Sequence, residues 1–77
     1  MTPDTYNRIR AHIETIEHIA VHSNDPGGGY MIVNEMIKIQ KEYNPNAMPV
    51  DTSCGNCVLS LFKDVYRNYK LNENSFS

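Results

Sequence analysis

The stretch that most constrains the fold is residues 51–69, which read DTSCGNCVLSLFKDVYRNY. It opens with helix-capping residue types and then places apolar residues three and four positions apart, the pattern of a helix with one buried face. At 100° per residue the apolar positions fall within a sector of roughly 140°, and the basic residues fall on the opposite side. The stretch therefore predicts a long amphipathic helix. Its expected buried residues are Cys54, Cys57, Val58, Leu61, Phe62, Val65 and Tyr69.

A first helix is expected from residue 2 to about residue 22. Thr2 is a good N-cap, Pro3 suits the first helical position, and Asp4 complements the positive end of the helix dipole. Apolar residues recur at spacings of three and four, so we expect one continuous helix with one packing stripe. That stripe consists of Tyr6, Ile9, Ile13, Ile16 and Ala20.

Residues 23–29, SNDPGGG, are the clearest break in the helical pattern. Successive glycines lose much conformational freedom in a helix, and Asn, Asp and Pro favour turns. Glycine runs also occur in phosphate-binding loops, but no Gly-Lys-Ser/Thr sequence follows this one and no strand is expected before it. We therefore interpret the segment as a turn between two helices.

Residues 30–43 predict a second helix, which Asn44-Pro45 ends because a residue before proline is pushed out of the helical region. Its apolar surface is wider than one stripe, which suits the middle element of a bundle or an exposed contact patch. In the following connection, Met48 and Val50 are expected to pack against the core. The apolar residues of this helix are Ile32, Met36, Ile39 and Tyr43, flanked by Val33 and Ile37.

These three helices predict an all-α fold, a small three-helix bundle in one domain over residues 1–71, with a frayed tail at 72–77. The chain has 77 residues, and a chain of this size buries only about 60% of its unfolded surface. Marginal stability of this kind favours a protein partner or self-association.

Composition excludes several classes of function. With 40% hydrophobic and 21% charged residues, the chain is typical of ordinary soluble domains, and its formal net charge of −2 argues against general nucleic-acid binding. No apolar run is long enough to span a membrane, and the first residues lack the apolar core of a secretory signal. We therefore expect a cytoplasmic protein with no membrane contact, in which Cys54 and Cys57 are thiols rather than a disulfide.

The segment Cys54-Gly55-Asn56-Cys57 is the sharpest candidate for chemistry. A thiol near a helix N-terminus is more easily ionised, and dithiol oxidoreductases use C-x-x-C at such a position. These four residues resemble the thioredoxin active site, but that family requires a preceding strand and a central sheet, which are not expected here. The favoured interpretation is that both cysteines are small apolar core residues, and thiol-redox function stays an alternative.

A zinc site is a second alternative for the same cysteines. His18 and His22 are four residues apart on the first helix, a spacing that lets two imidazoles reach one ion. With Cys54 and Cys57 they make a Cys2His2 set. However, both histidines lie opposite the apolar stripe of their helix, whereas the cysteines lie on or beside the apolar face of theirs. We therefore expect no metal and no other cofactor.

No catalytic constellation can be identified, so the chain is expected not to be an enzyme and to have no small-molecule substrate. Its last helix does carry Lys63, Arg67 and Lys70 in one exposed row beside Tyr66. Cations near a helix C-terminus are favoured by the helix dipole alone, but such a row also suits an acidic protein or a nucleic-acid backbone. The full set of interaction candidates is Lys63, Tyr66, Arg67, Lys70, Tyr30 and Ile37.

A final helix that begins with a capped C-x-x-C and closes with Tyr66, Arg67, Tyr69 and Lys70 resembles small bacteriophage-encoded helical proteins. The resemblance covers about the last third of the chain. It implies a phage accessory protein or a structural component of the virion that acts through protein contacts, located in the host cytoplasm or the virion. The resulting hypothesis is a non-enzymatic protein–protein interaction module.

Overall fold

The computed structural model describes the backbone of residues 1–23 and 29–76, together with their side chains except those of residues 29, 30 and 76. It contains four helices: α1 (Pro3–Ala11), α2 (Ile13–His22), α3 (Gly29–Tyr43) and α4 (Gly55–Phe76). The described residues include no strand, which confirms the all-α prediction. The prediction of three helices is corrected to four. The predicted turn at 23–29 falls mainly on residues 24–28, which lie outside the described residues.

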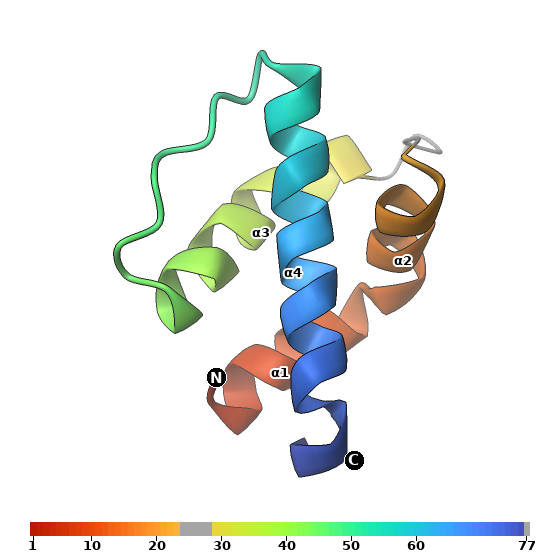
Figure 1. Ribbon diagram of the computed structural model, residues 1–77, viewed down its shortest axis with the longest axis vertical. Coiled ribbons are helices and arrows are strands. Elements are labelled where there is room, and N and C mark those ends of the chain that lie inside the picture. Colours follow the sequence, from red (N-terminus) through yellow and green to blue (C-terminus); the bar gives the residue numbers. More distant parts are fainter. Residues whose placement is uncertain (24–28, 77) are drawn as a thin grey trace.

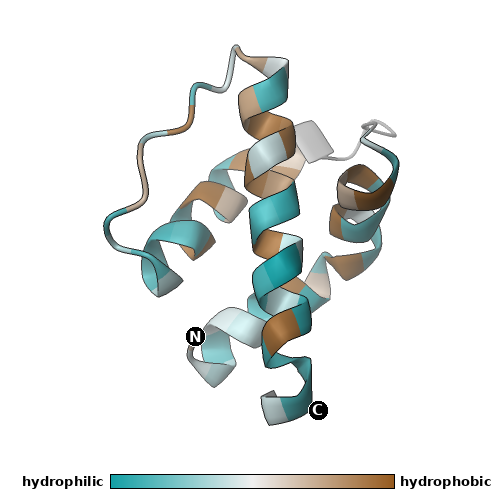
Figure 2. Ribbon diagram, viewed as in Figure 1, coloured by the Kyte–Doolittle hydropathy of each residue, from teal (hydrophilic) through white to brown (hydrophobic). Residues whose placement is uncertain are grey.

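Helix α4 is the central element of the fold. It contacts each of the other three helices, and Figure 1 shows α1, α2 and α3 arranged around it. Apolar and polar residues alternate around α4 in Figure 2, which gives this helix the buried face expected from its sequence. The regular pattern of residues 51–69 therefore marks the helix against which the others pack.

The first predicted helix is interrupted at His12. The amide of His12 donates to the carbonyl of Ile9 at 3.0 Å, a bond that spans one residue fewer than an α-helical bond, and His12 then serves as the N-cap of α2. Of the expected stripe, Tyr6, Ile9 and Ile16 are buried and Ile13 packs against the core, and Ile19 is buried as well. The apolar stripe is therefore largely confirmed, but the prediction of one continuous helix over residues 2–22 is wrong, because the chain turns at His12.

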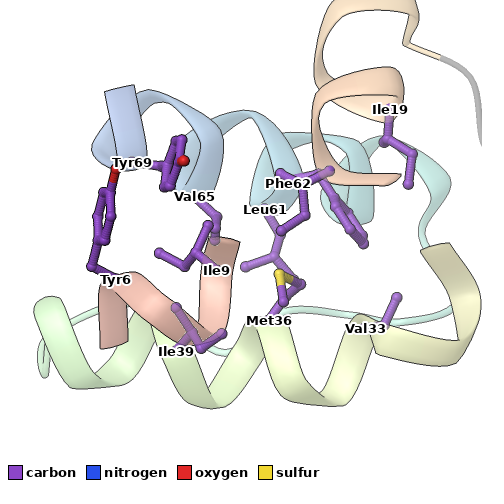
Figure 3. Close-up of a cluster of buried hydrophobic side chains, with 11 residues drawn as sticks. Tyr6, Ile9, Ile19, Val33, Met36, Ile39, Leu61, Phe62, Val65 and Tyr69 are labelled. Carbon is purple, nitrogen blue, oxygen red and sulfur yellow. The ribbon is translucent and has the colours of Figure 1, made fainter. Parts of the chain in front are cut away.

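One hydrophobic core joins the four helices. Figure 3 shows its side chains pointing toward one another from α1, α2, α3 and α4. On α4 the prediction is confirmed for the middle of the stretch, where Phe62 and Val65 are completely buried, but Val58 at its start is only half-buried. The buried core consists of Tyr6, Ile9, Ile16, Ile19, Val33, Met36, Ile39, Leu61, Phe62, Val65 and Tyr69.

The rings of Tyr6 and Tyr69 close one end of this core. They stack with their centroids 4.7 Å apart and their planes 9° from parallel. A hydrogen bond with Tyr6, together with burial, raises the pKa of Tyr69 to about 12. The pair therefore joins α1 to the later turns of α4, and Tyr69 stays protonated at neutral pH.

Polar side chains of α1 and α3 form a second set of contacts at the same end. Arg8 binds Glu35 at 2.6 Å and also pairs with Glu42. The buried hydroxyl of Thr5 donates to Glu42 at 2.8 Å and is itself hydrogen-bonded to Thr2. Hydrogen bonds from Thr5 and then Arg8 lower the pKa of Glu42. We call Thr5, Arg8, Glu35 and Glu42 the Arg8 network.

Helix α4 is longer than its sequence pattern suggests. It continues from Leu71 to Phe76, where the sequence predicts a frayed tail. Within this part the Asn72 side-chain amide donates to the carbonyl of Asn68 at 2.8 Å, and Lys70 pairs with Glu73 at 3.1 Å. These bonds between neighbouring turns support a helix that no longer carries an apolar stripe.

The connection between α3 and α4 runs across the surface. Met48 is 84% exposed, so the expectation that it packs against the core is wrong, while Val50 is half-buried and does contact the core. Close to α4, the Asp51 carboxylate accepts hydrogen bonds from the Ser53 hydroxyl at 2.6 Å and the Ser53 amide at 2.9 Å. These two bonds lower the pKa of Asp51 and fix the entry to the helix.

Candidate binding cleft and the C-x-x-C disulfide

The sequence-predicted cysteines form a disulfide. Cys54 and Cys57 are bonded to each other, with their Cα atoms 5.2 Å apart, so the prediction of two thiols is corrected. Both residues are half-buried and belong to neither the core nor the apolar residues packed against it. The reason is their position: Cys54 precedes the first residue of α4 and Cys57 lies in its first turn, before Leu61, the first residue of this helix in the buried core.

Cys54 caps helix α4. Its sulfur accepts a hydrogen bond from the Cys57 amide at 3.2 Å, and its carbonyl accepts the Val58 amide at 3.1 Å. The sequence predicts the cap among the residues just before Cys54. One of them, Ser53, donates a hydrogen bond to Asp51 instead. Gly55 faces open space, since a Cβ atom built there meets nothing within 4 Å. The disulfide therefore stands at an exposed helix start.

An open cleft of about 610 Å³ lies beside this start, where the last turn of α2 and the first turns of α3 meet α4. Among the described residues that line it, none is charged. Two large apolar side chains are exposed on the same helix ends but do not line the cleft: Val21 in α2 is 59% exposed and Met31 in α3 is 80% exposed. The lining residues are Ile19, Ser23, Val33, Asn34, Thr52, Gly55, Asn56, Val58, Leu59 and Phe62.

A second hollow, of about 670 Å³, lies on the other side of α4 beneath the α3–α4 connection. It includes Cys57, Met48 and the charged residues Lys63, Asp64 and Arg67. Burial raises the pKa of Asp64, but hydrogen bonds from Tyr43, Gln40 and Arg67 outweigh it, so the pKa lies below its ordinary value. This hollow is therefore a polar surface on which Asp64 is already paired.

The predicted basic row is largely neutralised within α4 itself. Arg67 pairs with Asp64 at 2.8 Å and Lys70 pairs with Glu73 at 3.1 Å, and Lys63 is exposed. Each pair joins residues three apart, a spacing at which side chains of one helix meet. An acidic protein or a nucleic-acid backbone would have to compete with these carboxylates, which weakens both interpretations of the row.

Two of the remaining interaction candidates, Tyr66 and Ile37, do not join the cleft. Tyr66 and Ile37 are half-buried and pack against the core, and neither lines either hollow. The side chain of Tyr30 lies outside the described part of the chain. The cleft residues that the sequence did not single out as interaction candidates include Asn34, Asn56 and Leu59, and their nearness to a break in the helical pattern was the available signal.

The described residues do not assemble the Cys2His2 set. His18 and His22 approach each other, with ring centroids 4.7 Å apart, on α2. Across residues 1–23 and 29–76, no three His, Cys, Asp or Glu side chains gather in a way that could hold a metal ion. The histidines and the cysteines therefore remain two separate pairs in the described structure.

Comparisons of the chain with protein-family models, curated protein sequences and solved structures gave no match. None of the described helices combines the length and apolar character that crossing a membrane requires. The function is therefore argued from the surface features of the molecule.

Proposed function

We propose that this protein is a non-enzymatic interaction module that binds an apolar, helical segment of a partner protein in the cleft between α2, α3 and α4. One observation carries the proposal: the described lining of the open cleft includes Ile19, Val33, Val58, Leu59 and Phe62 and contains no charged residue. Apolar side chains gathered in one open cleft are typical of protein-binding surfaces.

The lining of the cleft indicates the chemistry of its occupant. Val58, Leu59 and Phe62 present apolar side chains from successive turns of α4, which suits side chains that recur with helical spacing on a partner. Asn34 and Asn56 supply neutral donors and acceptors at its border. An apolar helix with an uncharged inner face satisfies both features, whereas a charged ligand would lose its hydration without gaining a counter-ion from the described lining.

The resemblance of the last third of the chain to small bacteriophage-encoded helical proteins supplies the biological setting of the proposal. In that setting the module is a phage accessory protein or a structural component of the virion, and its partner is a phage or host protein. The cleft supports a role in protein contact and favours neither of these two roles over the other.

A peptide-display experiment tests the proposal before any partner is identified. The wild-type protein is used to select from a library of random 16-residue peptides, and we expect enrichment of sequences with apolar residues three and four positions apart. Asn34→Lys should reduce binding of the selected peptides at least about tenfold, because it places a charge in the lining of the cleft at an exposed position. Met48→Lys is the matched control, since Met48 is 84% exposed and lies away from the cleft.

Several results would contradict the proposal. Peptides that bind the Asn34→Lys and Met48→Lys variants equally well do not use this cleft. Failure to enrich any peptide, combined with sedimentation of a dimer that Asn34→Lys dissociates, would assign the cleft to a second copy of this chain. Enrichment of acidic peptides without an apolar pattern would assign binding to the basic row of α4 instead.

A further inference from the structure

We propose that Cys54 and Cys57 form a redox-active pair that exchanges electrons with disulfide substrates, an activity separate from binding in the cleft. The pair is bonded in the structure and stands at the N-terminus of α4, a helix of 22 residues. It lies on the surface between the two hollows, since Gly55 and Asn56 line one and Cys57 lines the other.

The disulfide does not connect two different helices. Both sulfurs belong to the same turn, separated by three positions in sequence, and neither residue belongs to the hydrophobic core. All four helices are joined by the core, and the stacked Tyr6 and Tyr69 and the Arg8 network add further links. Opening the bond therefore removes no link between helices, and the fold is expected to persist in both redox states.

The surroundings of the pair favour the thiolate of Cys54. In the bonded state the Cys54 sulfur already accepts the Cys57 amide at 3.2 Å, and the same donor is available to a thiolate there. The positive end of the α4 dipole acts in the same direction. The nearest acidic residue in the sequence, Asp51, has its carboxylate engaged by two bonds from Ser53. Exposed Ser53 and Gly55 on either side of Cys54 leave room for a substrate.

The exchange proceeds in two balanced steps. In the reduced protein the Cys54 thiolate attacks one sulfur of a substrate disulfide, forming a mixed disulfide and releasing the other substrate sulfur as a thiolate. Cys57 then attacks the Cys54 sulfur, re-forms the bond seen in the structure, and releases the second substrate thiol. Two electrons pass from the pair to the substrate; the Cys57 proton ends on one released thiol, and the other released thiolate takes up from solvent the proton that Cys54 lost on ionising. A small-molecule thiol such as glutathione returns the pair to the reduced state.

The first experiment follows the wild-type protein in glutathione redox buffers. Alkylation of free thiols and mass spectrometry report the fraction oxidised, and far-UV circular dichroism reports the helices. We expect the pair to open and close reversibly with the helical signal unchanged. Opening that occurs only with loss of the helical signal would make the bond a structural staple and overturn the proposal. Stoichiometric zinc binding by the reduced protein that blocks re-oxidation would overturn it in favour of a metal site.

The second experiment compares two matched variants, Cys57→Ser and Cys54→Ser. At pH 7 the thiol left in Cys57→Ser should react with iodoacetamide about tenfold faster than the thiol left in Cys54→Ser. Cys57→Ser should also accumulate a mixed disulfide, because the second step is blocked. Equal rates, or a faster Cys57, would overturn the assignment of Cys54 as the attacking residue.

The third experiment tests whether the substrate disulfide belongs to a small molecule or to a protein. Reduced wild-type protein is mixed with glutathione disulfide in one arm and with insulin, which carries protein disulfides, in the other. Oxidation of the pair in either arm supports the exchange and identifies the source. No oxidation in either arm overturns it. The readout is the oxidation state of Cys54 and Cys57 and requires no peptide in the cleft, so its outcome is independent of the proposed partner binding.

Discussion

The two ends of this bundle are built differently. At one end the stacked Tyr6 and Tyr69 and the Arg8 network tie α1 to α4 and to α3. At the other end, around the start of α4, the helices leave an open cleft, exposed Val21 and Met31, and a surface disulfide. We call these the closed end and the open end.

The difference shows where this small chain obtains its stability and where it presents its surface. Every described buried polar side-chain atom has a hydrogen-bond partner, and a long-range polar contact lies at the closed end, where Thr5 meets Glu42 across 37 positions of sequence. The open end carries apolar side chains that stay exposed among the described residues. Stability at one end therefore permits an uncovered surface at the other.

The largest expected effect is the loss of a core side chain at the closed end. Ile9→Ala removes a completely buried residue and should lower the free energy of unfolding by about 2–5 kcal/mol. Leu59→Ala, at the half-buried cleft of the open end, should cost only about 1 kcal/mol because less surface returns to water. Urea denaturation measures both. Equal losses would remove the distinction between the ends.

The Arg8 network should contribute less than the core. Arg8→Met keeps the aliphatic stem but leaves Glu35 and Glu42 without their cation, and we expect a loss of about 1–2 kcal/mol, reduced by partial exposure to solvent. Arg67→Met is the control, because it breaks an ion pair of a 71% exposed side chain and should change little. A larger loss for Arg67→Met would indicate that the polar surface near the disulfide stabilises the fold.

Acid should weaken the fold through Glu42 and Asp64. Both carboxyls have a lowered pKa in the folded protein, so below their ordinary pKa values of 4.5 and 3.8 the unfolded chain binds more protons. Their stabilisation is present above those values and is lost as the pH falls through the lower folded values. Thermal denaturation between pH 6 and pH 2 should show a shallower decline for Glu42→Gln than for wild type. An identical decline would exclude Glu42 as a contributor.

The smallest expected effect comes from filling the unoccupied space beside Gly55 at the open end. Gly55→Ala meets no atom within 4 Å and should raise the free energy of unfolding by about 0.4–1 kcal/mol, because the alanine variant has less conformational freedom to lose on folding. Thermal denaturation of the variant and wild type measures this gain. A loss of stability would mean that the start of α4 is more crowded than the structure shows.

Local periodicity by itself determined much of this protein. It placed α3, predicted over 30–43 and found at Gly29–Tyr43, and it selected Leu61, Phe62, Val65 and Tyr69 as the buried face of α4. These features follow from spacings of three and four residues, which a single helix expresses whatever its neighbours are. The all-α class follows from the same spacings.

Only the tertiary structure decided the break at His12, the place of Cys54 and Cys57 outside the core, and the open cleft. Each depends on where helices meet: the chain turns between α1 and α2, and the core covers α4 from Leu61 onward but not its first turn. The Arg8 network likewise joins residues 27 and 34 positions apart. A repeating pattern encodes which face of a helix is apolar, but contacts between distant segments are set by how those faces pack together.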